Sequence, residues 1–549
     1  MTPHILPSQS PIPIRLPRGL AVLMLYSYSM LTMITASPVD PVALALLLAA
    51  LTGLYLAWYQ LRRNLESKKP YDNLPMPSNS HFLWGHQVFL QNREFQQNNS
   101  IMMVDHGNEY GQTGFWLWNM PAVSITDWRD ARAILRHEYQ RRRVFFYVKH
   151  FNMFLGSRNI GILQGREWKL HRAAVLRSFA PARVKSSKGI IAGVTQTLIQ
   201  SIRKRLKLSD MASPGTPLVL DIEPIIKMIA IDIFGKVAFS TDLDCSVNLE
   251  PSPVAIAFDF LGQDLARRMA APIQPTNFFY SFPTRANRQH HQARTLLRSF
   301  LAGIIQERRG PNAKQSSDLL AELLANAEGE DPMSDQAVLD TLLALLFAGY
   351  DTTSITLTYA LYQISQYPAV EDLLLQEINR ASDNLDNTDQ LVYVQGVLHE
   401  TLRLFPPAIA TARFLQKSLQ LRGGFEIPEQ SFVVIPIWLI QREAKNFPEP
   451  ESFRPDRWVK LQGDDWVERL EGDDFGSIAA ANRGAFFAFS AGARSCAGSK
   501  FAMQEATLVL AGLLKAFSFR AIPGYELTPV RSGIVQHPKG GIPMTINVR

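Results

Sequence analysis

Two long runs near the N-terminus contain no charged residue, and they limit what this part of the chain can become. Residues 19–36 and 42–59 are each close to the ~20 residues that a helix needs to cross a bilayer. The second run ends in aromatic residues, and lysines and arginines follow it directly. Because positive charge beside a span favours the cytosolic side, the rest of the chain is expected to face the cytosol.

The same runs define the predicted domains. Residues 1–65 are predicted to be a membrane anchor with one span at 42–59. A second span at 19–36 would make a hairpin with both ends in the cytosol, and a signal-like or peripheral segment is the alternative. Residues 66–85 are rich in proline and turn residues and are predicted to connect the anchor to a catalytic domain at 86–549.

Composition excludes several classes of protein. Of the 549 residues, 46% are hydrophobic and 19% are charged, which rules out a disordered chain. A net charge of +7 is a weak excess at this length and favours a membrane surface or an acidic protein partner over nucleic acid. Two cysteines are too few for a disulfide framework or a four-cysteine zinc site. One of them, Cys245, has an ordinary context and is predicted to be structural.

The residue pattern after the connector predicts a mainly α-helical domain with a small β portion. A long apolar helix is expected between Ser334, a candidate N-cap, and Pro368. The acidic run at 464–474 is expected to be a solvated loop. The predicted elements are helices at 221–239, 285–309, 336–367 and 497–514, and short strands at 113–118, 122–127 and within 421–440.

The segment Phe489–Gly498 (FSAGARSCAG) carries the strongest chemical signal. Gly492 and Gly498 permit tight turns, so backbone N–H groups can point at the sulfur of Cys496. Arg494 and the helix expected after the cysteine add positive charge, which should lower the thiol pKa. Cys496 is therefore predicted to be an anion, either a metal ligand or a nucleophile, with an inert cysteine in a turn as the alternative.

Two further patterns lie upstream. Glu400 and Arg403 are spaced i,i+3 in an apolar helix and are expected to form a buried pair, although such a pair alone is more often solvated.

Residues 348–353 (AGYDTT) lie within the long apolar helix. Gly349 and the threonines are expected to interrupt or bend it, with a glycine at a close helix crossing as the alternative. Asp351 is ionisable in apolar surroundings, which favours a functional role.

Taken together, these segments resemble the cytochrome P450 family over about residues 70–549. The resemblance implies the P450 fold and a haem b group, with Cys496 as the thiolate ligand of the iron. Trp168, Arg172, Arg413 and Arg494 would contact the haem propionates. The five fixed positions of the family's haem-binding loop, F-x-x-G-x-R-x-C-x-G, are matched by Phe489, Gly492, Arg494, Cys496 and Gly498.

The resemblance also implies roles for the upstream motifs. Arg457 would join Glu400 and Arg403 in a buried network behind the haem. Asp351 and Thr352 would form the acid–alcohol pair that relays protons during oxygen activation. The residues expected to line the substrate pocket are Ala348, Thr352, Ile409 and Ala410.

The implied function is that of a monooxygenase in the endoplasmic reticulum membrane, with its catalytic domain in the cytosol. It would insert one oxygen atom from dioxygen into a lipophilic small molecule, in lipid or specialised (secondary) metabolism. Electrons would come from NADPH through the flavoprotein NADPH–cytochrome P450 reductase, docked near Arg166, Lys169 and Lys500. Cytochrome b5 is a further candidate partner, and no nucleic acid partner is expected.

Two alternatives to this function stay open. A reductase-independent haem-thiolate isomerase or dehydratase is disfavoured by the intact Asp351–Thr352 pair, which such relatives usually lack. A non-catalytic membrane haem-binding protein is the second, and no segment resembling a signalling domain follows the globule.

Overall fold

The structure is a computed structural model that describes residues 107–549 apart from short gaps, together with positions 51, 71 and 74–76. The chain divides into two compact units, Met1–Lys69 and Pro70–Arg549. The predicted spans and connector lie almost entirely outside the described residues, so they stay predictions. The gaps are 118–119, 137–144, 270–279, 281, 312–315, 326–332, 382–389, 464, 469–483 and 533–534, and only the backbone is described at 117, 120, 145–148 and 531–532.

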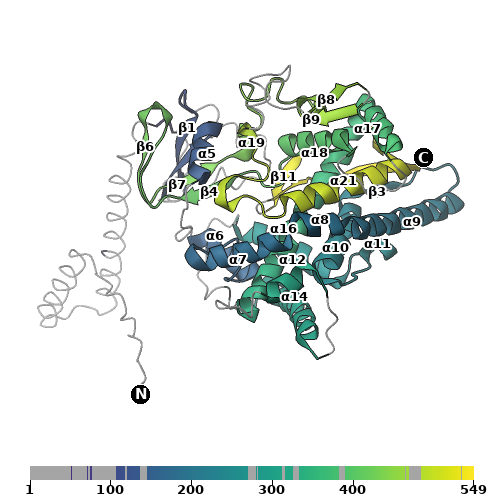
Figure 1. Ribbon diagram of the computed structural model, residues 1–549, viewed down its shortest axis with the longest axis horizontal. Helices are drawn as coiled ribbons and strands as arrows, with labels where there is room; N and C mark the ends of the chain where they lie inside the picture. The colour runs from purple at the N-terminus through teal and green to yellow at the C-terminus, as the bar shows by residue number, and fades with distance from the viewer. Residues whose placement is uncertain are drawn as a thin grey trace, which may run out of the picture. The chain divides into compact units, whose positions relative to one another are not determined.

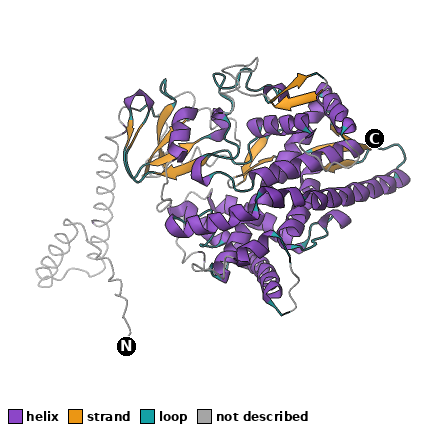
Figure 2. Cartoon of the chain, in the orientation of Figure 1, coloured by secondary structure: helices purple, strands orange, loops and turns teal. Residues whose placement is uncertain are grey.

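Helices make up most of the described part of the second unit (Figure 2), which confirms a mainly α-helical domain with a small β portion. Three short 3₁₀ turns, η3 (Arg422–Gly424), η4 (Pro455–Arg457) and η5 (Gly492–Arg494), add to them. The helices are α5 (Trp128–Arg136), α6 (Phe145–Leu155), α7 (Gly165–Ser178), α8 (Pro181–Ser186), α9 (Lys188–Ala212), α10 (Ile222–Phe239), α11 (Cys245–Asn248), α12 (Pro253–Met269), α14 (Arg285–Arg309), α15 (Leu319–Ala325), α16 (Asp335–Gln366), α17 (Pro368–Arg380), α18 (Val392–Leu404), α19 (Ile437–Ile440) and α21 (Ser499–Ala516).

Helix α16 runs through the helical region and carries much of its core (Figure 1). Ser334 caps its first turn by accepting a hydrogen bond from the Ala337 N–H at 3.3 Å, and Pro368 begins the next helix. One apolar cluster packs its C-terminal half with α10, α18 and α21, and another packs its N-terminal half with α12 and α14. Within the described ranges it is the only helix long and apolar enough to cross a membrane, and 67% of its apolar window is buried, as in a core helix.

The helix is continuous through residues 348–353, so the expected interruption is wrong. A β-carbon at Gly349 would lie 2.6 Å from the Phe234 ring of α10, so this glycine allows the close helix crossing that was the alternative. The Thr352 Oγ1 donates to the Ala348 carbonyl at 2.5 Å. Such a bond within one turn satisfies the hydroxyl without breaking the helix ladder.

The strands form small sheets. The largest has the order β1-β2-β7-β4, in which β2 and β7 are parallel and the other pairs are antiparallel. A second sheet has the order β10-β13-β3, and β5–β6, β8–β9 and β11–β12 form two-stranded pairs. The strands are β1 (Gln112–Leu117), β2 (Met120–Ile125), β3 (Val219–Asp221), β4 (Thr411–Phe414), β5 (Leu419–Gln420), β6 (Glu426–Ile427), β7 (Phe432–Ile435), β8 (Val459–Gln462), β9 (Asp465–Glu468), β10 (Phe517–Ala521), β11 (Pro529–Ser532), β12 (Val535–Pro538) and β13 (Pro543–Val548).

Part of the acidic run differs from its prediction. Residues 465–468 form strand β9 rather than a solvated loop, and they pair with β8. Trp466 explains the difference, because its ring lies against Tyr393 of α18 with 4.4 Å between the centroids. An aromatic contact of this kind fixes one face of a strand that is otherwise polar.

Candidate active site

One glycine determines the shape of the loop around Cys496. Gly492 has a φ of +73°, and a β-carbon there would lie 2.0 Å from the Leu135 carbonyl oxygen of α5, so only glycine fits. Gly498 has a φ of −94° and precedes α21, so its backbone conformation does not require glycine. The Cys496 N–H donates to the Phe489 carbonyl at 2.9 Å and closes the loop.

The Cys496 thiol keeps an exposed surface, although protein lies around most of it. Burial raises the pKa of this thiol, while the Gly498 N–H and the positive charge of Arg172 lower it. The expectation that the protein loop alone lowers the thiol pKa is therefore wrong, because burial outweighs both groups. A positive charge beside the sulfur, such as that of a bound metal ion, would favour the thiolate at this position.

Helix α7 lies beside this loop. The Arg494 guanidinium carbon is 4.1 Å from the centroid of a Trp168 ring, and its Nη2 donates to the Leu163 carbonyl at 2.9 Å. The Arg172 Nη2 donates to the Ser495 carbonyl at 2.5 Å. The Nε of Arg172 is buried and has no hydrogen-bond partner among the described residues. A buried guanidinium N–H without a partner indicates a missing acceptor, such as a carboxylate.

Two other polar residues, Arg413 and His171, are buried. Arg413 of β4 is 3% exposed, and its Nη1 donates to the Thr411 hydroxyl at 3.1 Å and to the Ala412 carbonyl at 2.8 Å. His171, next to Arg172, is also buried, and burial lowers its pKa.

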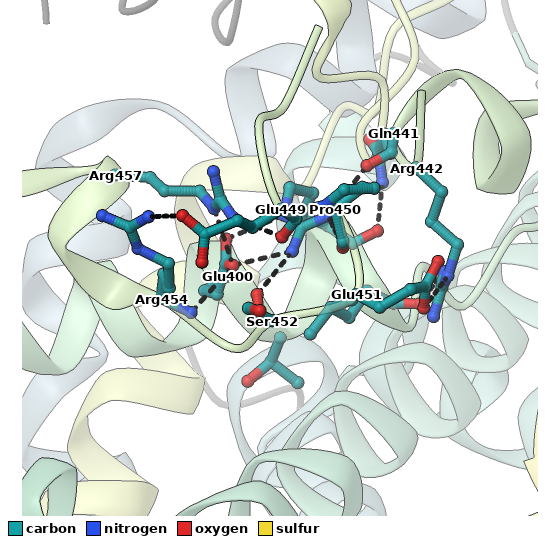
Figure 3. Close-up of polar contacts among 12 residues, drawn as sticks. Glu400, Gln441, Arg442, Glu449, Pro450, Glu451, Ser452, Arg454 and Arg457 are labelled. Atoms are coloured by element: carbon teal, nitrogen blue, oxygen red, sulfur yellow. Dashed lines mark hydrogen bonds and ion pairs between the residues drawn. The ribbon is translucent and has the colours of Figure 1, made fainter. Parts of the chain in front are cut away.

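Glu400 lies at the centre of a buried polar network (Figure 3). Arg403 donates to both of its carboxylate oxygens, at 2.9 and 2.8 Å, and the Arg457 Nε donates at 3.1 Å. The Arg454 backbone N–H and the Trp458 indole N–H complete the set at 3.0 and 2.9 Å. We call these five residues the Glu400 network. The remaining N–H groups of Arg403 are bound by the carbonyls of Gln441, Pro450 and Ser452.

Asp351 lies in a second group of charged residues, contributed by α10, α12, α16 and β12. We call Glu223, Lys227, Asp259, Asp351 and His537 the Asp351 cluster. The Lys227 Nζ is 3.2 Å from Glu223, 3.2 Å from Asp259 and 3.8 Å from Asp351. The two ring nitrogens of His537 are 2.8 Å from Glu223 and 3.4 Å from Asp351. Asp351 is thus held by two cationic side chains.

Comparison with known proteins decides the family. The sequence matches the Cytochrome P450 family over residues 75–543. The chain belongs to the cytochrome P450 family. Cytochrome P450 3A56 of Fundulus heteroclitus is 26% identical over 443 residues, which cover 75% of this chain and 80% of the relative. Cytochrome P450 3A5 of Homo sapiens is 26% identical over 437 residues, which also cover 75% of this chain and 80% of the relative. Cyclooctatin synthase of Streptomyces melanosporofaciens is 32% identical over 263 residues, 47% of this chain and 54% of that protein.

As a member of the cytochrome P450 family, the protein is an oxidoreductase of the haem-thiolate monooxygenase class. The residues in place fit a haem. Cys496 keeps an exposed surface and suits a metal ligand. Arg172 is the cation that lowers the thiol pKa, and its buried Nε needs an acceptor such as a propionate. Figure 1 shows α7 and α16 in the same helical region of this P450.

The residues predicted to line the substrate pocket differ in exposure. Ala348 is exposed although its neighbours on α16 are mostly buried, and Ala410 is exposed as well. Ile409 is 9% exposed, and its carbonyl accepts a hydrogen bond from the backbone N–H of Trp438 at 3.0 Å. Both exposed residues are small and apolar, which suits contact with a lipophilic group.

Sequence reasoning missed several members of both groups. Trp458 and the Arg454 backbone were not predicted to bind Glu400, because neither contact follows from a spacing rule. Lys227 carried a usable signal, since it is a charged residue within the strongly apolar run at 221–239. His537 carried no signal in its own segment.

Proposed function

We propose that this P450 inserts one oxygen atom from dioxygen into a lipophilic small molecule, in lipid or specialised metabolism. The observation that carries the proposal is the joining of the Cys496 loop to α7, with the buried Arg172 Nε left without an acceptor. The haem, when bound, supplies oxygen activation through its thiolate-ligated iron. Cys496 would ligate the iron, and Arg172, Arg413, Arg494 and Trp168 would bind the propionates.

The protein's own residues would perform three tasks. Small apolar side chains, Ala348 and Ala410 among them, would leave room for an apolar substrate and exclude water from it. Asp351 and Thr352 would hold an ordered water through which protons pass to the oxygen site. The Glu400 network would fix α18 against the segment that follows β7.

Electrons would come from NADPH through a flavoprotein reductase, with cytochrome b5 as a further donor. Arg166, Lys169 and Lys500 are exposed, and an acidic partner surface would be attracted to them. Reversing these three charges should slow reduction more at low ionic strength than at high ionic strength. Reduction rates that do not depend on salt would remove this docking face from the proposal.

The predicted domains are an anchor at 1–65, a connector at 66–85 and a catalytic domain at 86–549. They would place the protein at the endoplasmic reticulum membrane, with the catalytic domain in the cytosol. Removing residues 1–65 should release the protein from microsomes at least in part. Full retention of the truncated protein on membranes would show that the anchor lies elsewhere.

The function is tested by reconstituting the full chain with reductase in liposomes and screening lipophilic compounds by their binding spectra. The compounds that bind should increase NADPH consumption and yield products heavier by one oxygen atom. Product formation without NADPH and reductase would favour the isomerase or dehydratase alternative. Haem binding without any turnover would favour a binding protein.

A further inference from the structure

The Asp351 cluster contains more negative than positive side chains. Three carboxylates, Glu223, Asp259 and Asp351, surround one lysine and one imidazole. The Tyr350 hydroxyl donates to Asp259 at 3.1 Å and adds no charge. Side-chain exposure is 12% for Glu223, 14% for Asp351 and His537, 15% for Lys227 and 36% for Asp259, so Asp259 is the member most open to solvent.

His537 faces a carboxylate at each ring nitrogen. Its Nδ1 is 2.8 Å from Glu223 Oε1, and its Nε2 is 3.4 Å from Asp351 Oδ2. A neutral imidazole has one N–H and would place its other nitrogen lone pair against a carboxylate, whereas an imidazolium donates to both. The geometry therefore favours the protonated ring. Burial alone would lower the pKa of His537, but Asp351 and Glu223 raise it to about 9.

The other charged groups around the ring do not titrate in the same range. Burial would lower the pKa of Lys227, yet the three carboxylates raise it, so this lysine stays charged. Burial raises the pKa of the Tyr350 hydroxyl, which stays neutral. Farther out, Tyr359 and Tyr525 lie within electrostatic range of Glu223, and their pKa values are raised by burial as well. His537 is thus the member whose charge changes between pH 7 and 10.

Asp351 takes its orientation from these partners and not from Thr352. Burial would raise the pKa of the Asp351 carboxyl, but His537 and Lys227 hold it below its ordinary value. Lys227 lies at one carboxylate oxygen and His537 at the other. The Thr352 hydroxyl is bound to the Ala348 carbonyl, and among the described contacts none joins it to the Asp351 carboxylate.

We propose that His537 is a positioning residue for proton delivery, because its imidazolium form holds the Asp351 carboxylate in place on α16. The inference rests on the proposed oxygenase function. His537 would be the group that makes the product formed per NADPH consumed depend on pH. His537 lies on β12, next to Gln536, whose N–H and side chain donate to the Pro407 and Pro406 carbonyls. Strand β12 thus joins the Asp351 cluster to the chain that precedes the predicted substrate residues Ile409 and Ala410.

The test uses the full chain with reductase and the tightest-binding compound from the substrate screen. The readout is product formed per NADPH consumed between pH 7 and 10. In the wild type this ratio should fall with a midpoint near 9 as His537 loses its proton. His537→Gln should lower the ratio roughly tenfold at pH 7.5, less than the ~10²-fold typical of losing a catalytic acid, and should remove the transition. His291→Gln, an exposed histidine on α14, is the matched control and should keep the wild-type profile.

Glu223→Gln gives a sharper test, because it keeps an oxygen acceptor but removes one of the two charges that raise the His537 pKa. The midpoint should move to lower pH in this variant. A purely structural role predicts no such movement. An unchanged midpoint in Glu223→Gln, or a transition that persists in His537→Gln, would overturn the role of His537.

Unfolding provides a readout that does not depend on turnover. A pKa raised from 6.5 to about 9 means that the stability from His537 is fully present below about pH 6.5 and is lost as the pH rises through about 9. The melting-temperature difference between the wild type and His537→Gln should therefore close over that interval. A melting-temperature difference that does not change with pH would contradict the ion pairs of His537 with Glu223 and Asp351. A wild type that forms product without the pH transition would overturn the inference alone, and a wild type that forms none would overturn the proposed function.

Discussion

The Glu400 network is a buried group of charged side chains and the Asp351 cluster is a partly buried one, and they are built differently. Glu400 is a single carboxylate with two arginines, a backbone N–H and an indole N–H, and Glu400 and Arg403 are 0% exposed. The Asp351 cluster has three carboxylates around one lysine and one histidine, and Asp351 lies 3.4 and 3.8 Å from its cations. In the first group every carboxylate oxygen has a hydrogen-bond donor, whereas in the second Asp351 has longer contacts and His537 titrates.

The difference separates two uses of clustered charge. A closed network with fixed partners suits holding elements together, and removing one partner leaves an uncompensated charge. A looser cluster with excess negative charge suits a site where a proton or a carboxylate has to move. The two groups should therefore respond differently to substitution, with loss of structure in the first and loss of efficiency in the second.

The largest expected effect is on the Glu400 network. Arg403→Ala should lower the free energy of unfolding by about 3–5 kcal/mol, because Glu400 stays buried without its bidentate partner. The measurement is thermal unfolding together with the haem-loaded fraction. Arg454→Ala is the matched control, since only the Arg454 backbone binds Glu400 while its side chain pairs with the more exposed Glu449. Equal losses in the two variants would contradict the assigned network.

The next effect should be on efficiency and not on stability. Thr352→Ala removes a hydroxyl bound within α16, so unfolding should change by only a few tenths of a kcal/mol. NADPH consumption should stay near the wild-type rate, while product per NADPH falls on the order of tenfold and hydrogen peroxide rises. If product and NADPH consumption fell together, Thr352 would act through the helix alone.

The smallest effect should come from Asp259→Asn. This carboxylate is the most exposed of the Asp351 cluster, and Lys227 keeps two other partners without it. Removing one excess negative charge should change the free energy of unfolding by less than about 1 kcal/mol. A loss as large as that of Arg403→Ala would show that the cluster is a closed structural network after all.

The sequence predicted the first group better than the second for a physical reason. Glu400 and Arg403 are one helical turn apart, so spacing alone brings them together. Asp351 meets His537 only because β12 folds back beside α16, and no local pattern encodes that contact. The helix at 285–309 was predicted with its observed bounds, since an N-cap at Thr284 and a glycine at 310 delimit it. The expected interruption of α16 was wrong, because the helix is continuous there and its threonine hydroxyls donate to carbonyls one turn earlier without breaking it.

The electrostatic prediction for the thiol shows a further limit of sequence reasoning. Glycines and an arginine near Cys496 favour a thiolate, but the amount of protein around the sulfur cannot be read from a ten-residue segment. In the structure that burial has the larger effect on the thiol pKa. Ligation by iron, and not the loop alone, is then what would make this cysteine an anion.

The most direct test of the account is therefore the spectrum of the reduced, carbon monoxide-bound full chain. The wild type should give the spectrum of a thiolate-ligated haem. Cys496→Ala should lose it, and Cys245→Ala should retain it because Cys245 is buried beside Asp232, with its backbone N–H bound to that carboxylate. A thiolate-type spectrum that persists in Cys496→Ala would contradict the central claim that Cys496 is the haem ligand.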